Sequence, residues 1–510
     1  MRIAHAAAAL LLAAGAPLPA AAPANDTART ARLFDALRGQ PARLRLFLHA
    51  MPKGADLHNH LWGAVYAETM LDEADKAGFC VATDGSAILA PPCDLPRAVS
   101  ATGLMRSNSK LYSATIDSLS MRGAPATMPT IGGIAGHDRF FGTFDRFAPI
   151  AAHSPARMLA AARERAADDN LVYLETMTNP PASGAAAALA VARHVPADDP
   201  AAAFAALAPD LPRLIAAART ETDQVDRAAD ALLGCGTPRA APACALTVRY
   251  QAFGLRTLPA DAVFGQLLLA FALVDADPRY VGVNLVAPED GPVALADYDR
   301  HMAMLRYLAT RYPKVPITLH AGELTLGLVK PDQLRDHIGK AVTIAGARRI
   351  GHGVDIAHER NAAALLARMA RDGIAVEVNL TSNDGILGVR GTDHPLALYR
   401  TAGVPVILST DDAGVSRSDM TNEYLRAATE QGLDYPALKM IARASLQYSF
   451  LSGESLWQPG AIGRYGSACA AGLQAPSCRT LIARSERAAA QSKLEQALTA
   501  FEADILHHPF

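Results

Sequence analysis

Short runs of apolar residues recur along the chain at intervals that suit a parallel sheet. Eight of these runs have the length and the continuous hydrophobic character of strands buried on both faces. From the second run onward, most are separated by segments with helical spacing of apolar residues, such as residues 298–312 and 361–371. Eight strands alternating with helices favour a (β/α)8 TIM barrel, and a doubly wound open sheet is the alternative. The predicted strands are residues 55–60, 171–176, 246–253, 280–286, 315–320, 348–352, 374–380 and 404–409.

The same pattern divides the chain beyond residue 24 into three parts. Residues 25–50 have helical periodicity and form a helical lead to the barrel, which we expect over residues 51–450. The crossover after the first strand is too long for one helix, so we expect an insertion at about residues 65–165 that folds over one end of the barrel. Residues 451–510 are predicted to form a C-terminal helical extension.

Residues 1–24 have the pattern of a signal peptide. Arg2 precedes an apolar stretch, residues 6–14, and Ala22-Pro23-Ala24 is a small-residue cleavage pattern. The apolar stretch is too short to span a bilayer, and we expect no other stretch to span one. The pattern predicts a protein that is exported to the periplasm or the extracellular space. An Ala-rich N-terminal tail is the alternative.

The six cysteines agree with export, because they fall into three local pairs in segments that we expect to be loops. An even number of cysteines in an exported chain indicates disulfides, although sequence alone does not fix their connectivity. Free buried thiols are the alternative. The preferred pairs are Cys80–Cys93, Cys235–Cys244 and Cys469–Cys478.

Composition and charge place the chain among globular proteins. Half of the 510 residues are hydrophobic and 19% are charged, which excludes a disordered chain. The length alone suggests about three domains, but barrels often exceed the usual domain size as one unit. The formal net charge of -2 indicates neither nucleic acid nor an anionic membrane as a partner. The pattern carries no signal for an oligomeric state.

Ionisable side chains gather at the ends of the predicted strands, where barrels carry their functional residues. The first strand ends in "LHNH", so His58 and His60 point to the same face and reach one point in the barrel mouth. His320 ends the fifth strand, and Asp411 and Asp412 follow the eighth. Three histidines and a carboxylate from different strands are typical of a Zn²⁺ site with an open position for water. We predict His58, His60, His320 and one of the two aspartates as ligands.

Such a site also needs a proton donor for the substrate and a group that orients or deprotonates the water. Glu323 follows the fifth strand, and His352 lies between two glycines at the end of the sixth. These two residues and the remaining aspartate are the candidates. Each has a structural alternative, as a turn residue, a helix cap or a core histidine. Their coincidence at strand ends favours the catalytic interpretation.

Six stretches of the chain occur in the order in which a known family has them. On these stretches the chain resembles the metal-dependent adenosine deaminases of the amidohydrolase superfamily. The long first crossover, the segment "HDRFFGTFDRF" and the export signal resemble the secreted branch of that family, the adenosine-deaminase-related growth factors. The matching stretches are "MPKGADLHNHLWGA" (51–64), "HAGE" (320–323), "RIGHGVD" (349–355), "VNLTSN" (378–383), "HPLALYRTAGVPVILSTDDAG" (394–414) and "TNEY" (421–424).

The resemblance implies one Zn²⁺ per chain and a role for each candidate residue. Glu323 would protonate N1 of a purine, and His352 would orient or deprotonate the zinc-bound water that attacks C6. Asp412 would hydrogen-bond the water or purine N7. The implied zinc ligands are His58, His60, His320 and Asp411.

Some positions depart from the family or extend its pattern. The family usually has Gly at the end of the fourth strand, with its backbone N–H against purine N3, whereas this chain has Ala287. Pro commonly follows the aspartate pair, and here Ala413 stands there. The stretch "YVGVNLVAPED" has no Lys, which favours one metal over two. Phe140 and Phe141 are predicted to pack on the purine, and packing within the insertion is the alternative.

The function that the resemblance implies is hydrolytic deamination of adenosine, and of 2'-deoxyadenosine, to inosine and ammonia. The expected partner is therefore a small-molecule purine nucleoside. One alternative is the same chemistry on adenine, an adenine nucleotide or a modified adenosine, with Arg139 and Arg146 as candidate phosphate ligands. Another is a non-catalytic extracellular binding protein on the same fold. The intact set of metal-binding and acid–base residues favours the enzyme.

Overall fold

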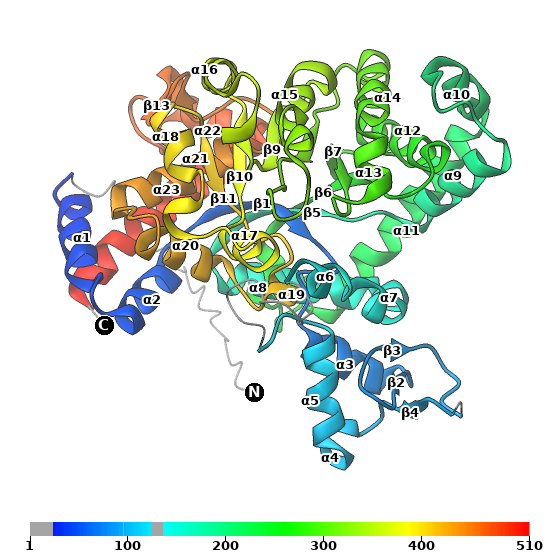
Figure 1. The fold of residues 1–510 in the computed structure, drawn as a ribbon. Helices are drawn as coiled ribbons and strands as arrows, with labels where there is room; N and C mark the ends of the chain where they lie inside the picture. The colour runs from blue at the N-terminus through cyan, green and yellow to red at the C-terminus, as the bar shows by residue number, and fades with distance from the viewer. Residues whose placement is uncertain (1–23, 95, 124–135, 509–510) are drawn as a thin grey trace, which may run out of the picture.

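The computed structural model describes residues 24–94, 96–123 and 136–508 (Figure 1). The predicted export signal, residues 1–24, lies outside the described residues except for its last residue.

Eight parallel strands form a closed barrel at the centre of the molecule. Two four-stranded sheets, in the orders β1-β5-β6-β7 and β8-β9-β10-β11, are joined by the bridges Asn59–Asp411 and Val283–Ile317. The predicted (β/α)8 barrel is confirmed, and the open-sheet alternative is wrong because closure leaves no free edge. The strands are β1 (Gly54–His60), β5 (Leu171–Met177), β6 (Thr247–Leu255), β7 (Tyr280–Val286), β8 (Thr318–Ala321), β9 (Arg349–His352), β10 (Ala375–Val378) and β11 (Val406–Leu408).

Each of the eight apolar runs overlaps one strand of the barrel, but the last four strands are shorter than the runs that predicted them. Strands β8 to β10 have four residues each, and β11 has three. The last two apolar runs continue past the ends of β10 and β11 because the chain stays buried as it leaves the ladder. Leu380, for example, is buried and already begins α17 (Leu380–Leu387).

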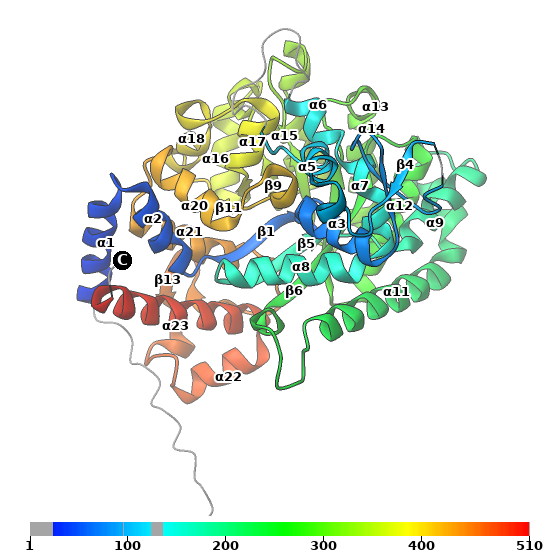
Figure 2. The same ribbon diagram turned by 90° about the horizontal axis from the view of Figure 1, so that it is seen from below.

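Helices cover the outside of the barrel (Figure 2). In α16 the buried residues are Leu365, Leu366 and Met369, which form one apolar stripe, and the helix ends at Gly373 with φ of +66°. Helix α12 is buried over most of its length because α9 and α14 pack on it from outside. The covering helices are α8 (Pro155–Asp168), α9 (Pro181–Ala192), α11 (Leu211–Leu232), α12 (Ala260–Ala276), α14 (Tyr298–Arg311), α16 (Ala362–Asp372), α18 (Leu396–Thr401) and α21 (Tyr435–Gln447).

One helical stretch, Pro200–Leu232, is long and apolar enough to cross a membrane by length and composition alone. It comprises α10 (Pro200–Leu207), a 3-10 turn and α11. Its second half, α11, carries many charged residues. In the structure α11 packs on α8, α9 and α12, with Leu211, Leu214 and Ala218 buried. The stretch therefore serves here as a covering helix of the barrel.

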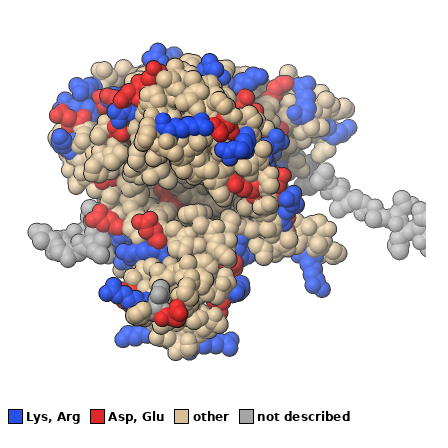
Figure 3. All heavy atoms as spheres, turned by 90° about the vertical axis from the view of Figure 1, so that its right-hand side faces the viewer, with Lys and Arg blue, Asp and Glu red and all other residues tan. Residues whose placement is uncertain are grey.

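The chain between β1 and β5 forms a lobe that projects from one end of the barrel (Figure 1). An antiparallel sheet and helices α3 to α5 build the lobe, and α6 and α7 lead back to the barrel. Figure 3 shows the lobe below the barrel, with basic and acidic side chains interspersed on the face in view. The elements are α3 (Ala67–Lys76), β2 (Cys80–Ala82), β3 (Ile88–Leu89), β4 (Ala98–Ser100), α4 (Leu104–Ser107), α5 (Ser109–Ser118), α6 (Gly136–Phe141) and α7 (Phe144–His153).

The two ends of the described chain pack on each other beside the barrel. Helices α1 (Ala24–Leu37) and α2 (Pro41–Ala50) precede β1, and α1 lies against the C-terminal helix α23 (Glu486–His507) in both views. The ring of Phe47 lies 5.2 Å from that of Phe501 and 5.8 Å from that of Tyr435. This aromatic cluster joins the lead, α21 and the tail. Before α23 the tail contains β12 (Trp457–Gln458), β13 (Ala461–Tyr465) and α22 (Pro476–Arg484).

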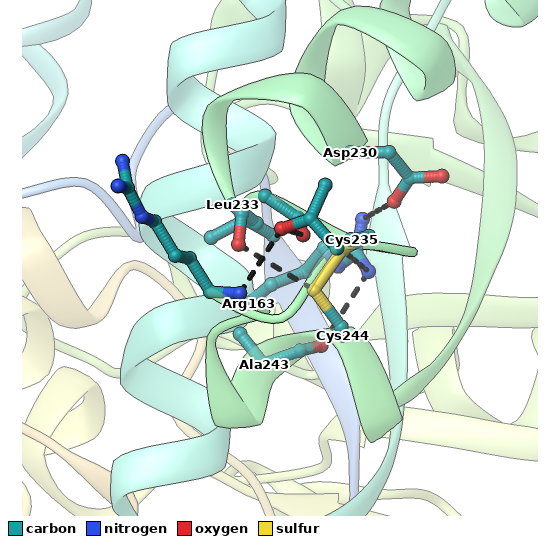
Figure 4. Close-up of a disulfide and its surroundings, with 9 residues drawn as sticks. Arg163, Asp230, Leu233, Cys235, Ala243 and Cys244 are labelled. Atoms are coloured by element: carbon teal, nitrogen blue, oxygen red, sulfur yellow. Dashed lines mark hydrogen bonds and ion pairs between the residues drawn. A yellow bond between two sulfur atoms is a disulfide. The ribbon is translucent and has the colours of Figure 1, made fainter. Parts of the chain in front are cut away.

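Three disulfides connect the cysteines in the preferred neighbour pairs, Cys80–Cys93, Cys235–Cys244 and Cys469–Cys478. Cys235–Cys244 closes the loop between α11 and β6 (Figure 4). Arg163 of α8 reaches this loop, where its guanidinium donates to the Asp230 carboxylate at 2.7 Å and to the Ala243 carbonyl at 3.4 Å. The disulfide and this buried arginine fix the loop against the barrel.

A buried ion-pair network crosses the barrel interior below its mouth. Arg349 of β9 donates to Glu175 of β5 at 2.6 Å and to Glu377 of β10 at 2.5 Å. Its guanidinium also lies 3.7 Å from the ring of Phe450. All three charged residues are at most 1% exposed. Because both carboxylates are buried, they depend on Arg349 for charge compensation, and Glu377 also contacts His58 Nδ1 at 2.7 Å.

We predict that Arg349→Met lowers the free energy of unfolding by about 3–5 kcal/mol, because it removes the buried cation that compensates Glu175 and Glu377. Urea unfolding followed by circular dichroism measures the change. The matched control is Arg348→Met, which alters the exposed preceding residue and should change stability by less than about 0.5 kcal/mol. Equal losses in the two variants would contradict the prediction.

Candidate active site

Four predicted ligands converge at the carboxyl end of the barrel. His58 and His60 come from β1 and His320 from β8, and Asp411 follows β11. One ligand atom from each of the four lies within 4.8 Å of the others. Asp411 Oδ1 is 3.5 Å from His58 Nε2 and 3.2 Å from His60 Nε2. The structure thus brings together side chains that are more than 350 positions apart in the sequence.

The ring nitrogens of this cluster present lone pairs to a common point. His58 Nδ1 lies 2.7 Å from Glu377 Oε2 and donates to it, so Nε2 is bare whenever the ring is neutral. His320 Nδ1 lies 3.0 Å from Asn284 Oδ1, which also accepts from the backbone N–H of Leu285 and is thereby fixed as oxygen. His320 Nε2 is therefore bare as well.

This donor set fits a metal ion. His58 Nε2 is buried without a hydrogen-bond partner in the described part of the chain, and the Nε2 atoms of His60 and His320 face each other at 3.1 Å. Converging lone pairs and a carboxylate repel one another unless a proton or a metal ion lies between them. Three imidazoles and one carboxylate form the donor set that Zn²⁺ takes in catalytic sites. The described residues therefore contain a His/Asp cluster with the geometry of a metal site.

The electrostatics of His58 point the same way. Burial alone would lower the pKa of His58, but the carboxylates of Asp411 and Glu377 outweigh burial and raise it to about 10. Burial alone would raise the pKa of Glu377, but Arg349 and His58 lower it to about 2. A cation is thus favoured at His58 Nε2, and a metal ion would displace the proton. Glu377 is the outer partner that orients His58.

Three more predicted residues lie around the cluster, and two of them are buried carboxyl groups. Glu323 follows β8, and burial together with the negative charges of Asp411 and Glu289 raises its pKa well above the usual range. Burial and the neighbouring Asp411 also raise the pKa of Asp412. A Cβ at Gly63 would lie 1.6 Å from Asp412 Oδ1, so only glycine leaves room for this carboxyl group. Both groups favour the protonated form.

His352 ends β9 and lies beside the metal-site cluster. Its Nε2 is 3.8 Å from Asp411 Oδ2, and its Nδ1 is 3.6 Å from Glu323 Oε1. Burial lowers the pKa of His352 to about 3, so its ring is neutral. The structure therefore places the predicted proton donor, the predicted water-orienting histidine and the second aspartate around one point. Their catalytic roles remain predictions.

The backbone is strained at three positions of the site. His352, Asp411 and Ala287 have φ values of +67°, +57° and +84°, which L residues with a Cβ rarely adopt. Such positions persist where the surrounding structure fixes them, and they cluster at functional sites. At the end of β7, Ala287 occupies a conformation that suits glycine, the residue that the resemblance leads one to expect there.

The two predicted phenylalanines belong to α6. The ring of Phe140 is 2% exposed and lies 5.2 Å from that of Phe141 and 5.8 Å from that of Phe144, as the packing alternative expects. Phe141 is partly exposed and lies 4.9 Å from the ring of His137. His137 Nε2 is 2.9 Å from Asp290 Oδ1 in the loop after β7. Helix α6 is thus tied to the loop that contains Ala287.

Sequence reasoning missed a buried group that holds the "HAGE" turn in place. Glu289 accepts from the backbone N–H groups of Gly322 at 3.2 Å and Glu323 at 2.9 Å. It also lies 2.6 Å from His337 Nδ1, and Arg256 donates to the His320 carbonyl at 2.9 Å. Glu289 follows β7 in "NLVAPED", so an acidic residue just after a predicted strand was the available signal.

We predict that Ala287→Gly raises the free energy of unfolding by about 0.5–1 kcal/mol, because relief of the positive-φ strain outweighs the flexibility that glycine adds to the unfolded chain. Thermal or urea unfolding measures the change. Ala397→Gly, on the exposed face of α18, is the matched control and should lower stability by about 1 kcal/mol. A loss of stability in Ala287→Gly would contradict the prediction.

Comparison with known proteins identifies the family of this chain. A model of the adenosine deaminase family matches residues 137–456; His58 and His60 precede the matched region. The chain is 37% identical over 147 residues to an aminodeoxyfutalosine deaminase of Streptomyces coelicolor, covering 29% of this chain and 34% of that protein. It is 34% identical over 183 residues to an adenosine deaminase of Shewanella loihica, covering 36% and 50%. The alignments thus span about a third to a half of these relatives.

Solved structures show the same fold at low sequence identity. The Arabidopsis ADAL protein in complex with IMP aligns with a TM-score of 0.52 and 19% identity, over 79% of this chain and 93% of that one. An amidohydrolase from B. ambifaria with bound Zn aligns with a TM-score of 0.51 and 18% identity, over 91% and 96%. Because the family model matches more than half of the residues, this chain belongs to the adenosine deaminase family.

Proposed function

We propose that this protein is a zinc-dependent aminohydrolase that deaminates adenosine and 2'-deoxyadenosine, releasing inosine or its deoxy form and ammonia. The observation that carries the proposal is the convergence of His58, His60, His320 and Asp411, with Glu323, His352 and Asp412 around the same point. A binding protein has no need of a metal-site cluster and buried acid–base groups together. Membership of the family supports the reaction type.

One zinc ion per chain would complete the site. Bound to three imidazoles and a carboxylate, zinc lowers the pKa of a water molecule and so supplies the nucleophile at neutral pH. The loop after β7 has no lysine that could bridge a second metal ion. The B. ambifaria structure that shares the fold contains Zn, which supports this choice of metal.

The residues around the cluster would divide the remaining work. Glu323 is protonated because of burial and nearby negative charge, and it would donate its proton to purine N1, which makes C6 more electrophilic. Asp412, also protonated, would donate a hydrogen bond to purine N7. The backbone N–H of Ala287 would meet N3. Phe141, on the partly exposed side of α6, would contact the base.

The two arginines that were candidates for binding a phosphate bond to backbone carbonyls instead. This favours a nucleoside over a nucleotide as the substrate. Arg139 donates to the carbonyls of Asp117, Ser120 and Arg122, at 2.9, 3.2 and 2.7 Å. Arg146 donates to the Ser118 carbonyl at 3.0 Å. Both side chains thus fasten α6 and α7 to the end of α5. The relatives still widen the substrate class, because one of them is an aminodeoxyfutalosine deaminase and a protein of the same fold is an Arabidopsis N6-mAMP deaminase.

We further propose that the protein acts in the periplasm or outside the cell. The N-terminal segment supports export, and so do three disulfides with no free cysteine among the described residues, because such bonds persist in oxidising compartments. The lobe between β1 and β5 agrees with the secreted branch that the sequence resembles.

A substrate panel with the zinc-loaded protein tests the reaction. Adenosine and 2'-deoxyadenosine should lose their ultraviolet absorbance as the product forms, and a chelator should abolish the change. The panel also contains aminodeoxyfutalosine, adenine, AMP and N6-methyl-AMP, so that it discriminates between substrates. Glu323→Gln should retain zinc and fold but lose at least about 100-fold in kcat, because a proton donor contributes about that much. No turnover of any purine by a fully loaded protein would refute the proposal.

Loss of the β1 histidines tests the metal site itself. His58→Ala and His60→Ala should each lower the bound zinc, measured by elemental analysis after dialysis, and activity should fall in proportion. His358→Ala removes an exposed imidazole elsewhere at the barrel mouth and should leave the zinc content unchanged. A double variant at positions 58 and 60 that is zinc-replete and active would overturn the assignment.

A further inference from the structure

Two buried polar residues near the site have no role in the reaction as proposed. Asn383 lies in α17, within "VNLTSN", and His394 precedes α18, at the start of "HPLALYRTAG". They are 0% and 2% exposed. In the structure they form a chain of hydrogen bonds that leads to His352. The direction of each bond in this chain follows from one fixed donor.

That fixed donor is a backbone group. The N–H of Leu396 donates to His394 Nδ1 at 3.1 Å, so Nδ1 of this ring is an acceptor and carries no proton. Burial, with the positive charge of Arg426, lowers the pKa of His394 to about 4, so the ring is neutral. Its single proton is therefore on Nε2. His394 Nε2 lies 3.1 Å from Asn383 Oδ1, so the Nε2–H donates a hydrogen bond to this amide oxygen.

The orientation of the Asn383 amide then follows. Its oxygen faces His394, so its NH₂ group faces His352 and lies 2.9 Å from Nδ1. An amide NH₂ can only donate, so His352 Nδ1 is an acceptor without a proton. A proton on Nδ1 would point at another N–H whether the ring were neutral or charged. The ring proton of His352 is thereby placed on Nε2.

Other polar groups near His352 Nδ1 are farther away. The amide of Asn379 approaches it at 3.4 Å, and Glu323 Oε1 lies at 3.6 Å, beyond hydrogen-bond range. Asn379 Oδ1 has no partner among the described residues, so nothing fixes that amide in the opposite orientation. Asn383 is therefore the group that decides the polarity at Nδ1.

We propose that His394 and Asn383 are positioning residues that hold His352 in the tautomer with its proton on Nε2. This nitrogen faces the metal site, 3.8 Å from Asp411 Oδ2, and is buried without a partner among the described residues. His352 thus donates a hydrogen bond to the attacking water and orients it, and does not take its proton. The inference about the water rests on the proposed function; the tautomer itself does not.

Asn383→Asp is the decisive variant. A carboxylate in the same place still accepts from His394 Nε2–H, but its second oxygen accepts where the amide NH₂ donated. Only the polarity toward His352 is reversed, so its ring proton should move to Nδ1. Asn361→Asp introduces the same chemical change at an exposed position before α16 and is the matched control. His394→Phe removes the anchor and should leave a mixture of the two tautomers.

The main readout is two-bond ¹H–¹⁵N NMR of the ¹⁵N-histidine-labelled protein, with the His352 signals assigned by their absence in His352→Gln. It is recorded on the metal-free and the zinc-loaded protein. We expect the Nε2–H tautomer in the unsubstituted protein and in Asn361→Asp, and the Nδ1–H tautomer in Asn383→Asp. An Nδ1–H tautomer in the unsubstituted protein, or an unchanged tautomer in Asn383→Asp, overturns the proposal.

Kinetics separate a positioning role from a merely structural one. Asn383→Asp should lower kcat by about 10- to 100-fold with little change in KM, because the purine contacts are retained. An unchanged kcat in a variant whose tautomer has moved overturns the assigned role of the N–H. The unsubstituted protein could deaminate no purine and still show the Nε2–H tautomer, with the proton on Nδ1 in Asn383→Asp. In that case the proposed function fails, while the positioning role of His394 and Asn383 stands.

Discussion

The convergence of bare imidazole nitrogens and a carboxylate on one point is the constraint around which the barrel mouth is built. Lone pairs that face one another at about 3 Å are repulsive, and a proton or a metal ion between them makes the arrangement favourable. The protein holds this arrangement because each ligand extends from a strand end or the residues just after it. His58 and His60 share a face of β1, and the Asn59–Asp411 bridge closes the barrel beside them. The closure that removes the sheet edge is therefore also what brings the ligands together.

Charge compensation below the mouth follows from that requirement. Glu377 orients His58 and needs a counter-charge, which Arg349 supplies together with a bond to Glu175. Glu289 holds the "HAGE" turn and lies 3.9 Å from Arg256. Glu323 lies above these networks, and among the described residues no Lys or Arg pairs with it, so burial and nearby negative charge keep its proton on. The surrounding charges thus leave the Glu377 carboxyl group ionised and the Glu323 carboxyl group protonated.

How much the sequence could predict depended on the range of each interaction. Parallel strands buried on both faces give continuous apolar runs, so the strands were predictable, and period two placed His58 and His60 on one face. The partners Glu289 and His337 are 48 positions apart and lie outside any strand, so no local pattern connects them. The packing of Phe140 was ambiguous because an aromatic segment looks the same whether it lines a pocket or a core. The stretch Pro200–Leu232 is long and apolar enough by composition to cross a membrane, but only the structure shows that its helix α11 packs on α8, α9 and α12.

The outer partners of the imidazoles distinguish a metal ligand from a hydrogen-bond donor. The oxygen of Glu377 accepts from His58 Nδ1, and that of Asn284 accepts from His320 Nδ1, so both rings turn a lone pair toward the site. Asn383 instead donates to His352 Nδ1, and that ring turns an N–H toward the same point. Rings of identical chemistry thus take opposite roles because the atoms behind them have opposite polarity. Distance to the metal site alone would not have separated them, since the rings of His58 and His352 are 5.0 Å apart and those of His58 and His60 5.5 Å.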